Sequence, residues 1–507
     1  MISKKDDPIK TAAIFSHVSY KHLASALLAG LALRLFFIAH FSPYAGDTKF
    51  YEELARNWLD HRVYGLFVHG RLLPVDMRMP GYPAFLAAIY AVFGRANKAI
   101  LVVQAVVDLA TCILASLIAA RLAPFSKRTL VATIALWMAA LCPFTANYSA
   151  VVLTEVLATF LTTLGLLVFV LVLSNPSMDR PLRAFDKRSL FSAVGWFLLG
   201  GVIVALGTFV RPEAPLLVVS VGVVLCARWR HHTDWPKLAL ATLWMAVGLL
   251  VPLMPWAARN ARTMGRIEFF APRYAETQGD FIPRGFYEWT RTWMVRFGDA
   301  YLGPWKLDKA PIPVATLPGS AFDSATERAR VEALLSRYNS DLNMTPALDR
   351  EFALLARERT ARRPLRTYFF IPMARAWMMW FTPRIELLPY SGKLWPPSEK
   401  WRNNRMDFGV TLGFGILNCI YVGLAFVGAW RSRSHPALAL LIAFVVIRTA
   451  LLTQLHTVEP RYVIVCFPAI LALGALACAI PLRAGSGFLF PARRSQVSIP
   501  GTAWLQR

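Results

Sequence analysis

The chain has 507 residues, of which 56% are hydrophobic, and 55 Lys and Arg against 30 Asp and Glu give it a formal charge of +25. Apolar runs of membrane length argue against a soluble protein, and no nucleic-acid-binding module accompanies the positive charge. We therefore expect membrane lipids, and no nucleic acid, to be the partner of the basic residues. The six cysteines lie mostly inside apolar runs without CxxC spacing, so neither a disulfide framework nor a zinc knuckle is indicated.

Ten apolar stretches have about the ~20 residues that a membrane-spanning helix needs. A segment in lipid must satisfy its own backbone hydrogen bonds, so these stretches are predicted to be helices. The expected fold is an all-α polytopic membrane protein with about ten or more transmembrane helices. The stretches are residues 22–41, 98–120, 129–147, 150–173, 190–208, 212–227, 238–255, 406–429, 436–453 and 461–481.

The distribution of basic residues predicts the orientation of these spans. Alternate connections carry Arg and Lys, as at Arg121, Lys127 and Arg128, whereas the short connections between them have almost no Lys. Residues 1–21 are therefore expected in the cytoplasm, with residues 22–41 as an uncleaved signal anchor. The N-terminal transmembrane module is expected over residues 22–255 and the C-terminal helices over 406–481. Residues 42–94 and 256–405 then lie outside, and residues 482–507 form a disordered cytoplasmic tail.

The first outer segment is predicted to contain two helices at the membrane surface. From Phe50 onward, Tyr51, Ala55 and Trp58 fall on one face of a helix, and aromatic residues suit the headgroup zone. The apolar piece after Pro80 is too short to span a bilayer. These helices form a surface beside which Asp47 is held.

The second outer segment, residues 256–405, is predicted to be a smaller extracytoplasmic insert. Apolar spacing indicates amphipathic helices over residues 327–338 and 346–363. Residues 365–381 are rich in aromatics but are interrupted by Pro372 and Arg375, so an interfacial helix is preferred to a span.

Charged and polar residues from five separate segments are expected to meet at the outer face. Ionisable groups near the membrane are costly and by default point to a site or pathway. Glu155 is expected about two turns inside the fourth span. Simpler interpretations remain for each residue: Asp47 as a helix cap, the arginines as anchors of span ends, and Glu155 in a structural ion pair. The charged members are Asp47, Arg78, Glu155, Arg211, Glu213, Arg259, His456, Glu459 and Arg461.

These residue types suit transfer of a group from a phosphate leaving group. The planar donors of Arg bind phosphate, and a lone carboxylate can act as general base for a hydroxyl or amine. Soluble nucleotide donors are cytosolic, so an outer-face phosphate donor would be attached to a lipid.

Several motifs resemble the bacterial GT-C superfamily glycosyltransferases of the protein-mannosyltransferase and aminoarabinose-transferase type. They are GDTKFYEELARNW, RMPGYPAFLAAIYAVFG, NYSAVVLTEVLATFL, LGTFVRPEAPLLV, PWAARNARTMGR, ARRPLRTYFFIPMARAWMMWFTPR and HTVEPRYVIVCFPAIL. The resemblance spans residues 31–481, and the shared order of the motifs carries it. It implies an inverting enzyme of the bacterial inner membrane, with its site on the periplasmic face, that uses a polyprenyl-phosphate-sugar donor.

The resemblance also implies roles for individual residues. Asp47 matches the acidic residue of the first loop, taken as the catalytic base, and Glu155 matches the acidic residue at the top of the fourth span. The basic residues Arg78, Arg211, Arg259 and Arg461 would face the lipid phosphate, and Tyr82, Glu213 and His456 complete the predicted substrate-binding set. Many relatives carry two adjacent acidic residues where this chain has Gly46-Asp47. No metal ligand is therefore assigned, although a divalent cation stays open.

The acceptor is expected to be a lipid, a glycan or a protein. Two alternatives to this glycosyltransferase remain. A lipid-linked-glycan flippase or transporter would place polar groups at mid-membrane depth in inverted repeats, which the sequence does not show clearly. A ligase or polymerase that uses a lipid diphosphate would differ only in its donor.

Overall fold

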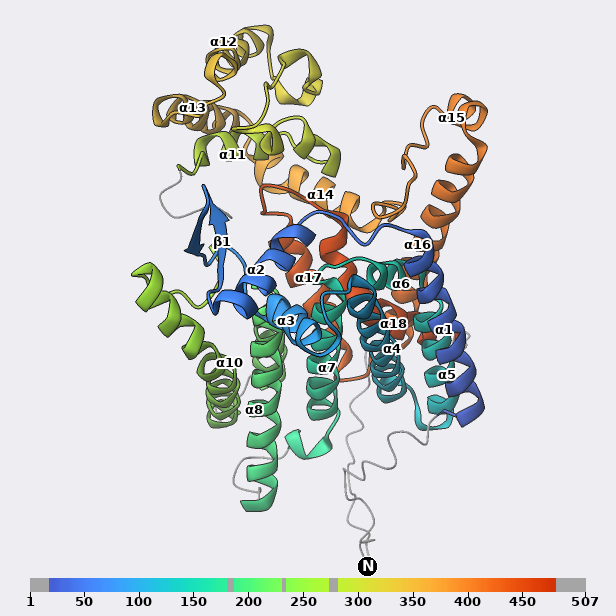
Figure 1. Cartoon of the computed structure of the whole chain (residues 1–507). Helices are drawn as coiled ribbons and strands as arrows, with labels where there is room; N and C mark the ends of the chain where they lie inside the picture. The colour runs from blue at the N-terminus through green and yellow to red at the C-terminus, as the bar shows by residue number, and fades with distance from the viewer. Residues whose placement is uncertain (1–17, 180–186, 230–233, 273–280, 480–507) are drawn as a thin grey trace, which may run out of the picture.

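A computed structural model of the chain describes residues 18–179, 187–229, 234–272 and 281–479. It is a bundle of helices with smaller elements gathered over one end, which we call the insert-bearing end (Figure 1). By length and composition, seven stretches of the described residues could cross a membrane, or eight if one bent pair counts as a span. They are α1 (Tyr20–His40), α4 (Asn97–Leu122), α7 (Glu155–Leu173), α8 (Lys187–Val210), α10 (Trp235–Met264), α16 (Arg405–Arg431) and the stretch Pro460–Ala479, which contains α18 (Phe467–Ala479).

The ten predicted spans all contain helix, but three are bent or short. In the predicted third span, α5 (Arg128–Ala140) and α6 (Pro143–Ala146) belong to a pair bent by 46°, and Pro143 explains the break. The other two are α9 (Leu216–Arg228) and α17 (Leu438–Leu452), with 13 and 15 residues. α9 starts later than predicted because residues 211–215 form a turn. The predicted tail and most of the predicted cytoplasmic N-terminus lie outside the described residues.

The first outer segment contains the two predicted helices, α2 (Thr48–His61) and α3 (Gly81–Phe93). It also contains an antiparallel hairpin of β1 (Gly65–Val68) and β2 (Arg71–Pro74), with Leu66 opposite Leu73, which the sequence analysis did not anticipate. His69 and Gly70 both have positive φ, as a two-residue hairpin turn of the primed type requires.

The insert has its own apolar core. It is built on α11 (Arg284–Arg291), α12 (Ala325–Asp341) and α13 (Pro346–Arg362), and the last two coincide with the predicted amphipathic helices. Phe286, Trp289 and Phe352 are fully buried in this core and contact one another edge-on or tilted. A π-helical turn (Arg366–Phe370) then leads into α14 (Ile371–Trp380), and α15 (Pro397–Asn403) precedes α16. α10 extends to Met264, so the first residues of the predicted insert belong to that helix.

Close helix packing makes the bundle rigid in two places. α8 crosses α10 at Gly201 and Gly248, where a Cβ on either glycine would lie 2.4 Å from a carbonyl oxygen of the other helix. Gly428 of α16 packs against the backbone of α18 in the same way. α7 and the stretch that contains α18 are the most buried of the candidate spans. Their N-terminal ends meet at the insert-bearing end, and the charged residues lie there.

Candidate active site

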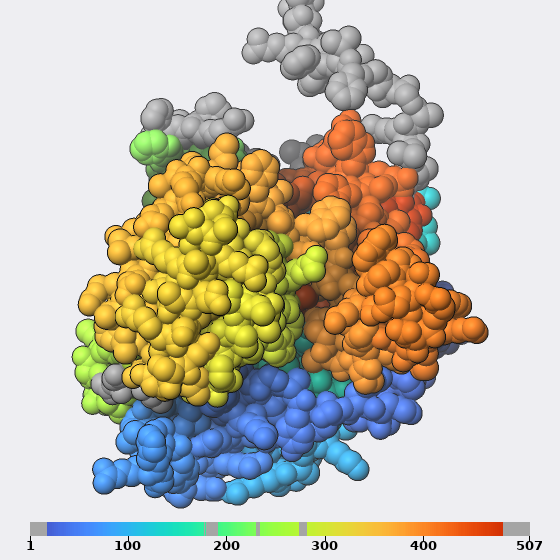
Figure 2. Space-filling model, turned by 90° about the horizontal axis from the view of Figure 1, so that it is seen from above, coloured from blue at the N-terminus to red at the C-terminus, as the bar shows by residue number. Residues whose placement is uncertain are grey.

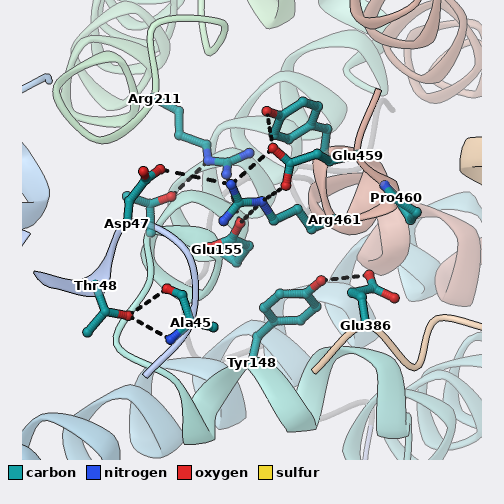
Figure 3. Close-up of polar contacts among 12 residues, drawn as sticks. Ala45, Asp47, Thr48, Tyr148, Glu155, Arg211, Glu386, Glu459, Pro460 and Arg461 are labelled. Atoms are coloured by element: carbon teal, nitrogen blue, oxygen red, sulfur yellow. Dashed lines mark hydrogen bonds and ion pairs between the residues drawn. The ribbon is translucent and has the colours of Figure 1, made fainter. Parts of the chain in front are cut away.

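Asp47 lies at the start of α2 and faces two arginines, Arg78 and Arg461. Figure 3 shows Asp47 beside Arg461. It occupies the N-cap position, yet its side chain makes no capping hydrogen bond, so capping does not explain this residue. Arg78 Nη2 donates to Asp47 Oδ1 at 3.0 Å, and Arg461 Nη2 lies 3.9 Å from Oδ2. The preceding Gly46 has φ +52°, and a Cβ there would lie 3.4 Å from Arg461 Nη1. A glycine at this position therefore lets the chain bring Asp47 against the guanidinium group.

Glu155 forms the floor of the site as the first residue of α7, not two turns inside a span as predicted. The difference arises because residues 151–154 are not helical. Arg211 Nη2 donates to Glu155 Oε1 at 2.8 Å, while Arg211 Nε donates to Thr154 Oγ1 at 2.9 Å. The N-terminal end of α7 also favours a negative charge here. Among the described residues Glu155 Oε2 has no hydrogen-bond partner, although the side chain is only 1% exposed, so a buried acceptor is left for a ligand.

Arg461 links carboxylates from three segments. Its Nε lies 2.5 Å from Glu459 Oε2 and 3.8 Å from Glu155 Oε1, in addition to the contact with Asp47. Tyr462 donates its hydroxyl hydrogen to Glu459 Oε1 at 2.7 Å, which holds that carboxylate in place. Arg461 thus connects the start of α2, the start of α7 and the entry to α18.

Glu213 closes the cluster on the side of α17. Arg211 Nη1 donates to Glu213 Oε1 at 3.3 Å, and Arg448 Nη2 donates to the same oxygen at 3.0 Å. Burial raises the pKa of Glu213, but Arg211 and Arg448 outweigh it, so this pKa lies below its ordinary value. Arg448 was not among the predicted site residues, although an arginine inside an apolar run such as 436–453 is itself a signal.

The cluster is electrically balanced. Four carboxylates (Asp47, Glu155, Glu213, Glu459) face four guanidinium groups (Arg78, Arg211, Arg448, Arg461), so the formal charges cancel. The side chain of Asp47 is 29% exposed, against 1% to 17% for the other three carboxylates. Asp47 is therefore the acid of this cluster that a substrate can most easily reach.

Three predicted residues lie outside this ion-pair cluster. Tyr82 is fully buried beneath it, donates to Gln104 Oε1 at 2.7 Å and packs edge-on against Tyr51. Arg259 donates to the carbonyl oxygens of Tyr64 and Val75, which attaches the hairpin segment to α10. His456 packs against Tyr287 of the insert, with ring centroids 5.0 Å apart.

A second pair of polar residues lies near the cluster. Tyr148 donates its hydroxyl hydrogen to Glu386 Oε1 at 2.9 Å, and Figure 3 shows this pair beside Glu155 and Arg461. Tyr148 and Glu155 line the same narrow gap at the top of α7. The loop with Glu386 is fixed by Arg384, which donates to Asn418 Oδ1 at 3.1 Å. The sequence analysis did not assign Tyr148 or Glu386 to the site.

The carboxylates of the cluster are paired with arginines rather than grouped with one another. In the part of the chain that the structure describes, no group of three His, Cys, Asp or Glu side chains is placed to hold a cation. The acids of the cluster instead face guanidinium groups, which compete directly with a metal for the same oxygens.

No protein-family model matches the sequence, and no curated protein sequence matches it. Among solved structures, the chain is similar to the oligosaccharyltransferase AglB of Archaeoglobus fulgidus, described in complex with an inhibitory peptide and a dolichol-phosphate. The identity is 11% and the TM-score 0.46, over 90% of this chain and 50% of AglB, so this chain spans about half the length of that protein. It is also similar to ArnT of Cupriavidus metallidurans bound to undecaprenyl phosphate, with 15% identity and a TM-score of 0.38 over 93% of this chain and 78% of ArnT. Both matches extend over almost the whole of this chain.

Proposed function

We propose that this chain transfers a sugar, with inversion, from a polyprenyl-phosphate-linked donor to an acceptor on the outer face of the bacterial cytoplasmic membrane. The observation that supports this most is the placement of Asp47. It is the most exposed carboxylate of the ion-pair cluster, and it faces Arg78 and Arg461 at the end of a membrane-spanning bundle. A base beside two guanidinium groups is what a hydroxyl acceptor and a phosphate leaving group require together.

In the proposed reaction, an acceptor hydroxyl oxygen attacks the anomeric carbon from the face opposite the phosphate. The bond between that carbon and the phosphate oxygen breaks, and its electron pair leaves with the polyprenyl phosphate. Asp47 takes the proton of the acceptor hydroxyl. The products are the glycosylated acceptor, polyprenyl phosphate and a protonated Asp47, which returns the proton to water.

The charge balance of the cluster supports this sequence. The sugar phosphodiester carries one negative charge, whereas the departing polyprenyl phosphate carries two. When Asp47 becomes protonated, the cluster gains one positive charge at the moment when the leaving group gains one negative charge. Arg78 and Arg461, which lose the charge of their partner Asp47, can then turn their donors to the phosphate.

The floor of the site would bind the sugar. Glu155 Oε2 is a buried acceptor without a partner among the described residues, and a sugar hydroxyl could donate to it. Glu213 and Glu459 hold Arg211, Arg448 and Arg461 in place, so few groups have to move when a substrate binds.

The test is Asp47→Asn in protein reconstituted into lipid nanodiscs, with undecaprenyl-phosphate-linked sugars as donors. Loss of a general base typically lowers the rate about 10²- to 10⁴-fold, and we expect kcat to fall by about that factor while the amount of folded protein stays the same. Asp60→Asn is the matched control, because Asp60 lies on the same helix and, among the described residues, pairs with the exposed Arg95 alone.

Retained turnover in Asp47→Asn would reject Asp47 as the base. Turnover only with undecaprenyl-diphosphate-linked sugars would reject the monophosphate donor in favour of a ligase or polymerase. Movement of a fluorescent lipid-linked sugar across the bilayer, without any transfer product, would reject the enzyme in favour of a flippase.

A further inference from the structure

Three aromatic rings of the insert lie together outside its core. Phe297 and Tyr301 are the ends of a short 3-10 helix, and Trp305 follows four residues later. Their ring centroids are 5.7, 5.4 and 4.4 Å apart for the pairs Phe297–Tyr301, Phe297–Trp305 and Tyr301–Trp305, and all three contacts are edge-on. The exposed fractions of Tyr301 and Trp305 are 55% and 37%. We call these three rings the aromatic platform.

The platform belongs to a segment that is tied to the loop with Glu459 and Arg461. Arg375, which is almost fully buried, donates from Nε to the carbonyl oxygen of Met294 and from Nη1 to those of Thr453 and Leu455. Arg291 Nη2 adds a bond of 2.7 Å to Gln454 Oε1. Residues 291–294 and 453–456 are thus held as one unit, and the platform starts three residues after the first of these segments.

The charges of the site act on Tyr301. Burial and the nearby Glu459 raise its pKa above the ordinary value, while Arg461 acts in the opposite direction. Seen from above, the insert and the α15 region enclose a hollow, and residues near the start of the red C-terminal segment are visible at its bottom (Figure 2).

The platform is rigid and has charged neighbours. Asp299 accepts hydrogen bonds from the backbone N–H groups of Val295 and Arg296, at 3.0 and 2.8 Å, which fixes the turn that holds Phe297 and Tyr301. Arg296 is exposed beside it, and Lys306 follows Trp305. A pyranose ring has an apolar face of C–H groups and a rim of hydroxyls, so it matches an aromatic surface with charged hydrogen-bonding groups at its edge.

We propose that Tyr301 and Trp305 form a saccharide-binding subsite that holds a sugar ring of the acceptor at the mouth of the active site. This rests on the proposed function, because it makes the acceptor a glycan or a glycolipid rather than an unmodified protein. The platform belongs to the insert, whose helices α11, α12 and α13 lie over one end of the bundle (Figure 1), and this position favours the acceptor over the sugar of a lipid-anchored donor.

The first experiment measures binding without turnover. Methyl glycosides of glucose, galactose, mannose and N-acetylglucosamine are added to the full chain in nanodiscs, and saturation-transfer NMR reports which sugar protons contact the protein. We expect the C–H protons of one ring face to be saturated for at least one glycoside. Tyr301→Ala and Trp305→Ala should weaken this binding about tenfold, which corresponds to about 1.4 kcal/mol. Tyr301→Phe keeps the ring and should retain most of it.

The control is Trp401→Ala, since Trp401 is also exposed but belongs to α15. Equal weakening by Trp401→Ala, or no saturation of any glycoside in the unmodified protein, would overturn the subsite. Quenching by brominated lipid that is weaker in Trp305→Ala than in the unmodified protein would overturn it too, because the platform would then face the membrane.

The second experiment separates the subsite from the catalytic proposal. In the transfer assay, Tyr301→Ala should raise the KM for the acceptor at least fivefold and leave the KM for the donor unchanged. A raised KM for the donor alone would overturn the assignment to the acceptor. If Asp47→Asn retains turnover while glycoside binding still depends on Tyr301 and Trp305, the subsite stands and only the assignment of the base fails.

Discussion

The ion pair between Arg211 and Glu155 should be strongly coupled because it is buried. The two side chains are 12% and 1% exposed, and the distance from Arg211 Nη2 to Glu155 Oε1 is 2.8 Å. The perturbation is a double-mutant cycle with Arg211→Met, Glu155→Gln and the double variant. Arg211→Met keeps an unbranched stem but is shorter than Arg and removes its charge and donors, whereas Glu155→Gln keeps the shape of Glu155.

The expected loss in the free energy of unfolding follows from the charged partners that each variant leaves unpaired. Breaking a buried ion pair by removing one partner costs about 3–5 kcal/mol. Of the described residues, Arg211→Met leaves Glu155 with Arg461 alone as ion-pair partner, at 3.8 Å, so we expect a loss of about 3 kcal/mol in the free energy of unfolding. Glu155→Gln leaves Arg211 its bonds to Thr154 and Glu213, and the expected loss is about 2 kcal/mol. Because the double variant leaves neither charge unpaired, the coupling energy should be about 2 kcal/mol.

The assay is unfolding of the purified protein by titration with SDS in mixed micelles. Arg330 and Glu358 of the insert supply the control, because their distance is also 2.8 Å but the side chains are 39% and 50% exposed. Exposed pairs contribute roughly 0.2–1 kcal/mol, so the coupling in the control cycle should be below about 1 kcal/mol. Additivity within about 0.5 kcal/mol at Arg211 and Glu155 would refute the reasoning from burial.

Three further predictions concern Gly46, Asp323 and Arg259. Gly46→Ala should destabilise the chain by about 1 kcal/mol and lower the rate of sugar transfer, because φ is positive and the new Cβ approaches Arg461. Gly70→Ala is the control: its φ is also positive, but no atom lies near the new Cβ, so it should lower stability alone. Burial raises the pKa of Asp323, but Arg366, Arg359 and Arg362 outweigh it and hold this pKa below its ordinary value. The pKa of Asp323 is thus lower in the folded than in the unfolded chain. Asp323 should therefore stabilise the insert above about pH 3.9 and lose this effect as the pH falls through its folded pKa. Asp323→Asn should make hydrogen exchange in α12 and α13 less sensitive to acid. Arg259→Ala should speed hydrogen exchange over residues 63–76 and leave α12 unchanged, since Arg259 donates to the backbone of Tyr64 and Val75 and, within the described part of the chain, makes no bond to α12; an equal change in both segments would contradict this.

The helices of this fold could be predicted because their signals are local. Apolar runs of membrane length and the spacing of residues 327–338 need only nearby residues. The hairpin was missed because its strands have four residues each, although His69-Gly70 is the kind of pair that favours a tight turn. The depth of Glu155 was misjudged because residues 150–154 are mostly apolar and contain neither Gly nor Pro to signal the end of a helix.

The sequence could indicate the members of the site better than their pairing. Six of the nine predicted residues lie in one ion-pair cluster. They could be grouped from the sequence because the predicted orientation of the spans put them at the same end of the bundle. Which carboxylate meets which arginine depends on contacts between distant segments: Arg448 and Glu213 are 235 residues apart, and Tyr148 and Glu386 are 238 apart. The catalytic and binding roles of these residues stay predictions.

The glycine contacts also restrict where the bundle can open sideways. Gly201 and Gly248 join α8 to α10, and Gly81 brings α3 against the last turn of α8, where a Cβ would lie 2.6 Å from the carbonyl oxygen of Phe209. Helices that touch through their backbones cannot separate slightly without leaving a void, so α3, α8 and α10 have to move as one block. Gly428 makes a second block of α16 and α18. α9 and α17 contact each other and belong to neither block. Under the proposed function, we therefore expect the isoprenoid tail of the donor to enter beside these two short helices.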